Sequence, residues 1–223
     1  MNNVLEQKEL FGATSEIEDG YLKIPSVKKD WTGNKQTSFS QQGARNFAKT
    51  EREQHDYYAS DPRTLRDLLR YESFENVWEI ACGGGHLGRV LEEHNILSRA
   101  TDLYDHEYGE VGIDFLEQKN IWDGDIITNP PYRFAQEFVE HSLELITEGH
   151  KVAMLLKIQF LEGKKRGEMY KKYPPKTVYV WPGRISCAMN GDFESIQHGS
   201  PMMFCWMIWK KGYHSDPIIK WIY

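Results

Sequence analysis

Residues 77–88 read VWEIACGGGHLG, and this stretch decides the fold. A short apolar run leads into a glycine turn, and Leu87, Val90 and Leu91 then follow at helical spacing. The pattern predicts a strand, a tight loop and a helix. Glycines at such a loop let the backbone approach a bound cofactor closely, and the helix that follows presents unpaired N–H groups to it.

The glycines and two later acids are typical of a site for an adenosine-containing cofactor. Gly83, Gly85 and Gly88 fit the spacing G-x-G-x-x-G, and Asp102 follows 19 residues after Gly83. A dinucleotide-binding fold places its ribose-binding acid at about this distance, so a nicotinamide enzyme is one reading. Asp114 supplies a second acid after the next chain reversal, suited to accept a hydrogen bond from an adenine amino group.

A second informative stretch is NPPY at residues 129–132, directly after the apolar run 126–128. Its two prolines fix their own φ and restrict the residue before each, so the turn is stiff. The Asn129 side-chain oxygen and a neighbouring backbone carbonyl form a pair of acceptors, and the Tyr132 ring offers a face for stacking. Such a turn can hold a planar nitrogen group, although Asn-Pro and Pro-Pro steps also form ordinary turns.

Taken together, these segments resemble the class I S-adenosylmethionine-dependent methyltransferases, in particular the branch that methylates adenine N6. The glycine turn from Glu79 resembles motif I of that family, Asp102 motif II, Asp114 motif III and residues 129–132 motif IV. Residues 56–62, DYYASDP, resemble motif X, and the order X, I, IV is that of the gamma group. A closer likeness is to the small phage-type or prophage-type DNA adenine methyltransferases, carried by residues 30–34, 51–53, 160–166 and 183–185.

The resemblance implies S-adenosylmethionine as cofactor, S-adenosylhomocysteine as product, and duplex DNA with a flipped adenine as substrate. The catalytic residues that it implies are Asn129, Pro130, Pro131 and Tyr132. The residues implied for cofactor binding are Tyr57, Tyr58, Ser60, Glu79, Ala81, Gly83, Gly85, Asp102, Asp114 and Asn129. Ser60 stands where the family more often has Thr, and it keeps the hydroxyl.

The apolar patterns predict an α/β fold. We expect strands at 77–81, 98–102, 125–128, 152–156, 177–181 and 202–209, and helices that begin at Pro62 or span 86–95, 133–148 and 161–172. Alternation of this kind predicts a mostly parallel sheet with helices on both faces. The resemblance implies a Rossmann-like class I methyltransferase fold with seven strands, the last one antiparallel. Residues 1–28 are expected to form a flexible lead-in, and residues 29–223 a single catalytic domain.

Charge is distributed unevenly along the chain. The net charge is −6, yet residues 151–184 hold 9 Lys and Arg against 2 acids, and residues 23–52 hold 7 against 2. Residues 72–148 hold 17 acids against 4 bases. The two basic stretches would attract a nucleic acid, with Lys164, Lys165, Arg166 and Arg184 as candidate phosphate contacts, although a solvated helix face explains the first three as well.

Other classes of protein are less compatible with the sequence. No apolar run is long enough for a membrane span, and the first residues lack a signal-peptide pattern, so we expect a cytoplasmic protein in a bacterial host or a phage-infected cell. The 3 cysteines suggest neither a disulfide framework nor a metal site. A protein methyltransferase acting on glutamine N5 and an RNA N6-adenine methyltransferase stay open as alternatives. A non-catalytic nucleic-acid-binding module would not need both the glycine loop and the residue 129–132 turn.

Overall fold

The computed structural model describes residues 17–18, 21–22, 58–183, 187–189 and 203–223. The chain divides into two compact units, Met1–Phe47 and Ala48–Tyr223. In the first unit, β1 (Ile17–Glu18) and β2 (Tyr21–Leu22) form an antiparallel hairpin. The expected lead-in over residues 1–28, and a domain boundary at residue 29, stay predictions.

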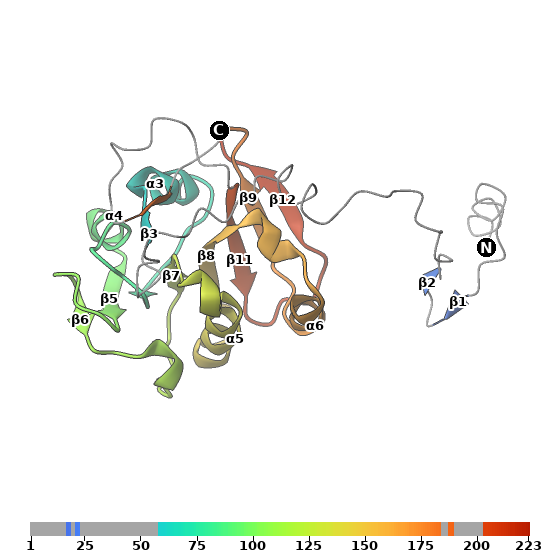
Figure 1. The fold of residues 1–223 in the computed structure, drawn as a ribbon, viewed down its shortest axis with the longest axis horizontal. Helices are drawn as coiled ribbons and strands as arrows, with labels where there is room; N and C mark the ends of the chain where they lie inside the picture. Colours follow the sequence, from blue (N-terminus) through green and yellow to red (C-terminus); the bar gives the residue numbers. More distant parts are fainter. Residues whose placement is uncertain (1–16, 19–20, 23–57, 184–186, 190–202) are drawn as a thin grey trace, which may run out of the picture. The chain divides into compact units, whose positions relative to one another are not determined.

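The second unit is built on an eight-stranded sheet in the order β12-β9-β11-β8-β7-β4-β5-β6 (Figure 1). Neighbouring strands are parallel except at β11, which is antiparallel to both β8 and β9. The strands of this sheet, in chain order, are β4 (Val77–Glu79), β5 (Leu97–Asp102), β6 (Glu110–Val111), β7 (Ile126–Thr128), β8 (Lys151–Lys157), β9 (Thr177–Val180), β11 (Phe204–Lys210) and β12 (Ile218–Trp221).

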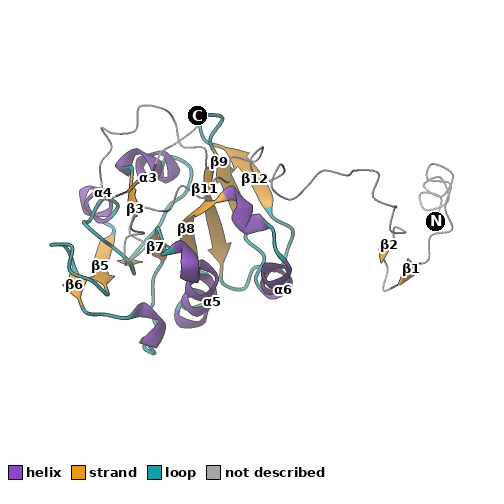
Figure 2. Ribbon diagram, viewed as in Figure 1, coloured by secondary structure: helices purple, strands orange, loops and turns teal. Residues whose placement is uncertain are grey.

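Helices cover both faces of this sheet, as the sequence predicted (Figure 2). The helices α3 (Pro62–Leu69) and α4 (Gly88–Glu93) pack on one face, and α5 (Ala135–Leu145) and α6 (Lys164–Lys172) pack on the other. Short 3-10 turns follow three of the strands: η1 (Phe115–Glu117), η2 (Tyr132–Phe134) and η3 (Ile158–Leu161). Strand β8 is buried on both sides because its successive side chains alternate between the two layers, as expected for a central strand.

The helix α3 begins where the sequence predicted. Pro62 occupies its first turn, and the Asp61 carboxylate accepts a hydrogen bond from the Arg63 backbone N–H at 2.9 Å. On the sheet side, the indole N–H of the fully buried Trp206 donates to the Thr64 carbonyl at 2.9 Å. This bond ties α3 to β11 and fixes the start of the segment that leads into the glycine turn.

All six predicted strands are present within a few residues of their expected bounds, and the predicted antiparallel strand is β11. The expected number of strands was wrong, because the sheet has eight rather than seven. The last strand of the chain is β12, which lies at the edge of the sheet and runs parallel to β9, so it is not the antiparallel member. All four side chains of β12 are exposed. Its sequence therefore lacks the alternation of buried apolar and exposed polar residues that would predict a strand.

A short pair of strands was also missed. The strand β3 (Tyr58–Ser60) pairs with β10 (Cys187–Met189) in an antiparallel arrangement, with Ser60 opposite Cys187. The two partners lie more than a hundred residues apart in the sequence. Local patterns carry no information about such a pairing.

Replacing Trp206 by Phe should lower the free energy of unfolding by about 2 kcal/mol, because the variant loses the bond to Thr64 and leaves a gap in the core. Trp221→Phe is the matched control, since the Trp221 side chain is 52% exposed. Urea denaturation of both variants measures the difference. Equal stability of the two variants would show that the tie between α3 and β11 contributes little.

Candidate functional site

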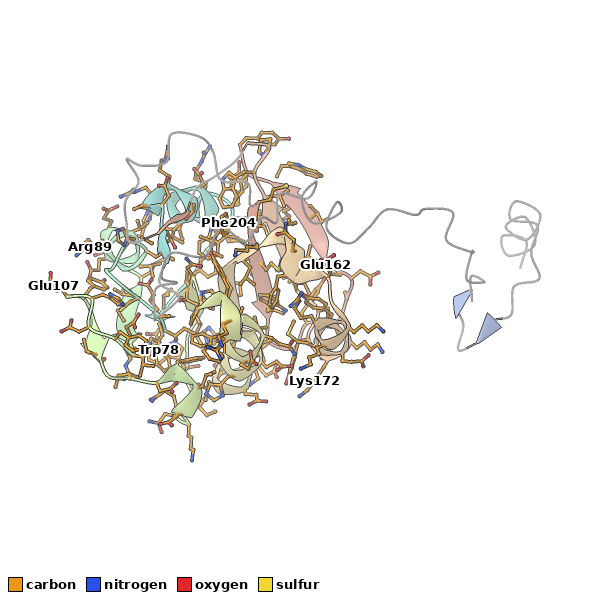
Figure 3. All side chains as sticks on the ribbon, in the orientation of Figure 1. Trp78, Arg89, Glu107, Glu162, Lys172 and Phe204 are labelled. Atoms are coloured by element: carbon orange, nitrogen blue, oxygen red, sulfur yellow. The ribbon has the colours of Figure 1, made fainter. Side chains whose placement is uncertain are left out.

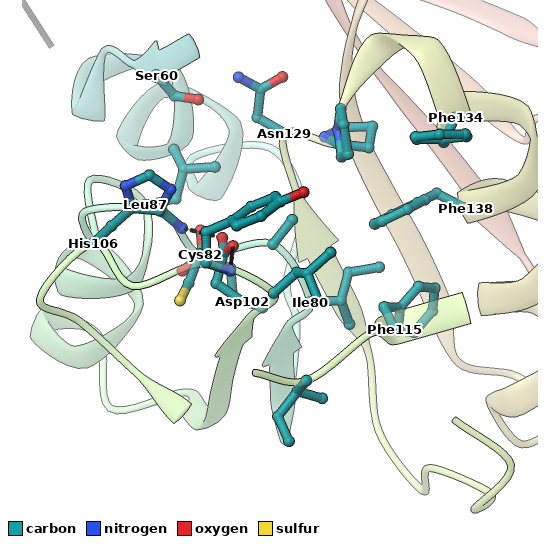
Figure 4. A pocket seen from close by; sticks show the side chains of 18 of the residues that line it. Ser60, Ile80, Cys82, Leu87, Asp102, His106, Phe115, Asn129, Phe134 and Phe138 are labelled. Carbon is teal, nitrogen blue, oxygen red and sulfur yellow. Dashed lines mark hydrogen bonds between the residues drawn. The ribbon is translucent and has the colours of Figure 1, made fainter. Parts of the chain in front are cut away.

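A cavity of about 550 Å³ opens at the carboxyl ends of β4, β5 and β7. Ligands in open α/β sheets bind at this edge. Figure 4 shows the rings of Phe115, Phe134 and Phe138 gathered at one end, and Asp102 and His106 at the other. The cavity wall includes these residues singled out from the sequence: Ser60, Glu79, Ala81, Gly83, Asp102, Asp114, Asn129, Pro130 and Pro131.

The Asp102 carboxylate joins two loops at the cavity floor. Its Oδ2 accepts a hydrogen bond from the Gly83 N–H at 2.8 Å, and its Oδ1 accepts one from the Tyr104 N–H at 2.9 Å. Gly83 has a φ of +49°, a left-handed conformation that favours glycine. A carboxylate has about four acceptor positions. Asp102 can therefore hold both loops and still accept a hydrogen bond from a ligand in the cavity.

Tyr108 packs on the outer side of the glycine turn, and no pattern in the sequence marks it as part of the site. A Cβ added to Gly85 would lie 2.5 Å from the Tyr108 ring, and one added to Gly88 would also meet that ring. The Tyr108 hydroxyl donates to Glu92 at 2.9 Å, and the Arg89 guanidinium lies 5.1 Å from the ring centre. Gly85 does not form part of the described cavity wall. Its missing side chain makes room for Tyr108.

Glu79 is a buried acid in the wall of the cavity. Its side chain is 1% exposed, and its Oε2 has no hydrogen-bond partner among the described residues. Burial raises the pKa of Glu79 well above the usual value for a glutamate, and the neighbouring charges of Asp102 and Glu92 raise it further. This corner of the cavity is therefore suited to a cationic group that would pair with the carboxylate.

The Cys82 thiol lies in the same turn and is buried. Burial raises the pKa of Cys82 to about 12, with further contributions from the carboxylates of Glu79 and Asp102. The thiol is therefore protonated at neutral pH. Covalent chemistry through a thiolate does not fit this site.

The opposite end of the cavity combines one acid with an aromatic wall. Asp114 caps the turn η1, where its Oδ1 accepts from the Leu116 N–H at 2.9 Å. The rings of Phe115 and Phe138 lie 5.1 Å apart behind it, and Ile80 completes the apolar wall. A flat, apolar ring system with an exocyclic donor would fit between these groups.

Ser60 brings the segment before the glycine turn to the cavity. It is buried at the end of β3 and forms part of the cavity wall. The backbone of Tyr58 begins the same strand, but its side chain and the whole of Tyr57 lie outside the described residues. The cofactor contacts expected of the two tyrosines stay predictions.

Residues 129–132 follow β7 at the same edge of the sheet. Asn129, Pro130 and Pro131 form part of the cavity wall, and Tyr132 begins the turn η2 beside it. The Pro131 carbonyl accepts a hydrogen bond from the Phe134 N–H at 2.9 Å, which fixes the turn. The Tyr132 hydroxyl is buried, and its half-buried ring packs against residues of both core layers. The prolines and this packing together make the segment rigid.

Three of the four candidate phosphate contacts lie outside the described cavity wall. Lys164, Lys165 and Arg166 form the first turn of α6, and no described residue of that helix lines the cavity. The Arg166 guanidinium donates to the Glu162 carbonyl at 2.7 Å and lies 5.0 Å from the Phe160 ring centre. Arg184 lies outside the described residues.

Other residues of the wall were not anticipated from the sequence, among them Leu103, Tyr104, His106 and Arg133. Three of these lie in the loop after β5, and nothing in their spacing marks them. In the described part of the chain, no group of acids, histidines and cysteines could hold a metal ion. The described helices include none that is long and apolar enough to cross a membrane.

We expect Gly88→Ala to lower the free energy of unfolding by about 1 to 3 kcal/mol, because the new methyl group would overlap Tyr108 and approach the Glu79 carboxylate at 2.7 Å. The control is Gly167→Ala in α6, where a Cβ meets nothing within 4 Å. That variant should be stabilised by about 0.5 to 1 kcal/mol because alanine favours the helix. Thermal denaturation of both compares them, and loss of stability in the control alone would contradict the packing described for Tyr108.

The protonation of Glu79 should make stability depend on pH. The folded protein holds the Glu79 proton more tightly than the unfolded chain does, so stability falls as pH rises above the usual value of 4.5 towards the raised pKa. Glu79→Gln keeps a neutral group and should remove this loss. Its stability relative to the wild type should therefore grow as pH rises above the usual glutamate value of 4.5, by at most about 1.4 kcal/mol per pH unit. Denaturant titrations along this pH series test it, with the exposed Glu117→Gln as control; parallel curves for wild type and Glu79→Gln would refute it.

No protein-family model matches the sequence, and no curated protein matches it. A protein of Agrobacterium tumefaciens assigned as an O-methyltransferase has a similar structure, with 10% identity and a TM-score of 0.53 over 72% of this chain and 85% of that one. A Listeria monocytogenes protein assigned to the class I S-adenosylmethionine-dependent methyltransferases has 11% identity and a TM-score of 0.48. The M protein of the type I restriction enzyme EcoKI has 15% identity and a TM-score of 0.47.

The last two likenesses each cover 72% of this chain, but only 62% and 45% of the other chain, respectively. This chain therefore spans less than two thirds of those proteins. At such low identities a structural likeness shows the fold alone. Together with the strand order, the likeness to the Agrobacterium protein shows that this chain has a Rossmann-like α/β fold.

Proposed function

We propose that the protein is an S-adenosylmethionine-dependent methyltransferase that transfers a methyl group to the N6 amino group of adenine in DNA. The observation that carries this proposal is the shared cavity. The acceptor pair at Asn129 and Pro130 lies in the same wall as the glycine turn, Asp102 and Asp114. A pair of hydrogen-bond acceptors for a planar amino group therefore adjoins a site suited to an adenosine-containing cofactor.

The residues of the cavity fit the proposed cofactor at both of its ends. The buried Glu79 carboxylate, whose Oε2 has no partner among the described residues, would pair with the ammonium of the methionine part. Asp102 would accept hydrogen bonds from the ribose hydroxyls, and Asp114 one from the adenine amino group. The wall of Phe115 and Phe138 would hold the adenine ring. When bound, the cofactor supplies a methyl group on a positively charged sulfur.

The protein's part in the chemistry is to prepare the acceptor nitrogen. The lone pair of adenine N6 is delocalised into the ring, which makes it a poor nucleophile. The Asn129 side-chain oxygen and the Pro130 carbonyl would accept the two amino hydrogens and favour a tetrahedral nitrogen. The same two oxygens would stabilise the positive charge that develops during transfer, before a proton leaves the nitrogen.

Tyr132 would stack on the adenine once it has left the duplex. Stacking on an aromatic ring is worth about 1 to 3 kcal/mol per base, which offsets part of the cost of unstacking and unpairing. The rigid setting of Tyr132 favours this role, because a ring that is already fixed loses little entropy when the base arrives.

DNA is the substrate that we favour over the two alternatives. The buried Ser60 brings the segment that resembles motif X to the cavity wall, and that segment is typical of adenine methyltransferases rather than of glutamine methyltransferases. The basic stretches at residues 23–52 and 151–184 suit a polyanion. We further propose residues 29–223 as the catalytic domain, and the cytoplasm of a bacterium or a phage-infected cell as the location.

One experiment separates the substrates. The full chain is incubated with S-adenosylmethionine labelled in its methyl group, together with unmethylated duplex DNA, RNA or a protein lysate. The proposal expects label in DNA, released as N6-methyladenine after digestion to nucleosides. Label in RNA or in a glutamine side chain would establish one of the alternatives, and no label in any of the three would overturn the methyltransferase proposal.

In the same assay, Asn129→Ala should reduce methyl transfer at least 100-fold, because the nitrogen loses one of its two acceptors. Its affinity for S-adenosylhomocysteine, measured by calorimetry, should stay within a few-fold of the wild type. Asn120→Ala serves as control because Asn120 is exposed and lies outside the described cavity wall. A turnover rate in Asn129→Ala equal to that of the wild type would contradict the proposed role of Asn129 as an acceptor.

A further inference from the structure

The Tyr132 ring is in contact with a cation. The Lys157 ammonium lies over it, 4.5 Å from the ring centre, and the Phe204 ring lies 6.1 Å away at an interplanar angle of 33°. Lys157 is the last residue of β8 and Phe204 the first of β11, and the two are cross-strand partners. The ring therefore rests on the end of a rigid pair of strands, with an ammonium over one face.

Lys157 lies where the apolar run of β8 ends. The five residues before it are buried, whereas Lys157 itself is half-buried. A lysine in such a position extends its hydrocarbon stem along the protein and keeps its charged end near water. The flexible stem lets the ammonium change its position without a change in the strand.

The ammonium occupies space that a stacked base would need. A flat base and a cation cannot lie on the same face of one ring at the same distance. A cation kept beside the amino nitrogen would also oppose the positive charge that develops there during transfer. Entry of the base on this face therefore displaces the ammonium, and catalysis benefits when the charge moves away from the nitrogen.

We propose that Lys157 is a substrate-binding residue that covers Tyr132 in the free protein, yields the ring face to the extruded adenine and pairs with the phosphate of the same nucleotide. The inference rests on the proposed function and deepens it. The phosphate is the anion that necessarily arrives with the base. An ammonium binds it as a compact point charge with three donors.

The chain contains a matched control. Lys172, labelled in Figure 3, lies in the last turn of α6. Its ammonium is 4.6 Å from the centre of the Tyr173 ring. The distance is almost the same as that between the Lys157 ammonium and the Tyr132 ring, 4.5 Å. Tyr132 lies between the cavity-wall residues Pro131 and Arg133, whereas no residue of α6 lines the described cavity.

The experiment measures binding of a fluorescent single-stranded oligodeoxyadenylate to the full chain by anisotropy, over a series of NaCl concentrations. We expect Lys157→Met to weaken binding about tenfold at low salt. The slope of log K against log [salt] should also become shallower by about 0.7, the value for one lost phosphate contact on a single strand. Lys157→Arg should restore the slope, and Lys172→Met should leave both quantities unchanged.

An unchanged slope in Lys157→Met, an equal loss in Lys172→Met, or no binding of the probe by the wild type would each overturn the inference. A merely structural role could weaken binding, but it would not change the number of counterions released. The proposed function is tested separately, by the transfer of labelled methyl groups from S-adenosylmethionine to duplex DNA in the wild-type protein. Methyl transfer to DNA together with an unchanged slope would reject only the role of Lys157.

Discussion

The site depends on one carboxylate. Asp102 stands at the end of β5 and accepts backbone N–H groups from Gly83, in the turn after β4, and from Tyr104, in its own loop. Neighbouring parallel strands bring their loops to the same edge but do not fix how the loops lie. These two hydrogen bonds do so, because each uses a backbone donor whose direction is set by the chain. The position of the glycine turn relative to the rest of the cavity follows from them.

The same corner carries an electrostatic cost. Glu79 is buried close enough to Asp102 and Glu92 for their charges to raise its pKa. A buried carboxylate without a partner is unfavourable, and a well-packed apolar residue would serve the core better. Protonation of Glu79 lowers this cost in the free protein, and a cationic ligand that pairs with the carboxylate would offset it. Tyr108 covers the outer side of the turn, and its hydroxyl donates a hydrogen bond to Glu92. A cation can therefore reach Glu79 from the side of the cavity.

Much of this arrangement could be predicted from the sequence. The strand, turn and helix at residues 77–93 are encoded locally by apolar spacing and glycine, and Asp102 is recognisable because it ends the next predicted strand. Two kinds of feature could not be predicted. The pairing of β3 with β10, and the addition of β12 to the sheet edge, depend on long-range contacts that leave no periodic pattern. Tyr108 and Gly85 show a different limit, because a glycine spacing does not reveal whether the missing side chain makes room for a ligand or for another residue.

Tyr132 illustrates why the surroundings of a motif matter as much as the motif. Its sequence position suggests a platform for a base, yet in the folded chain the ring already holds a partner, the Lys157 ammonium. A cation on an aromatic face is an exchangeable partner, since water and anions compete for the ammonium and flat apolar groups compete for the ring. An exposed ring without such a partner would attract any apolar surface. A ring covered by a cation is selective for its ligand. The displaced ammonium needs a new anionic partner, so a ligand that carries both a flat ring and an anion, as a nucleotide does, binds most favourably.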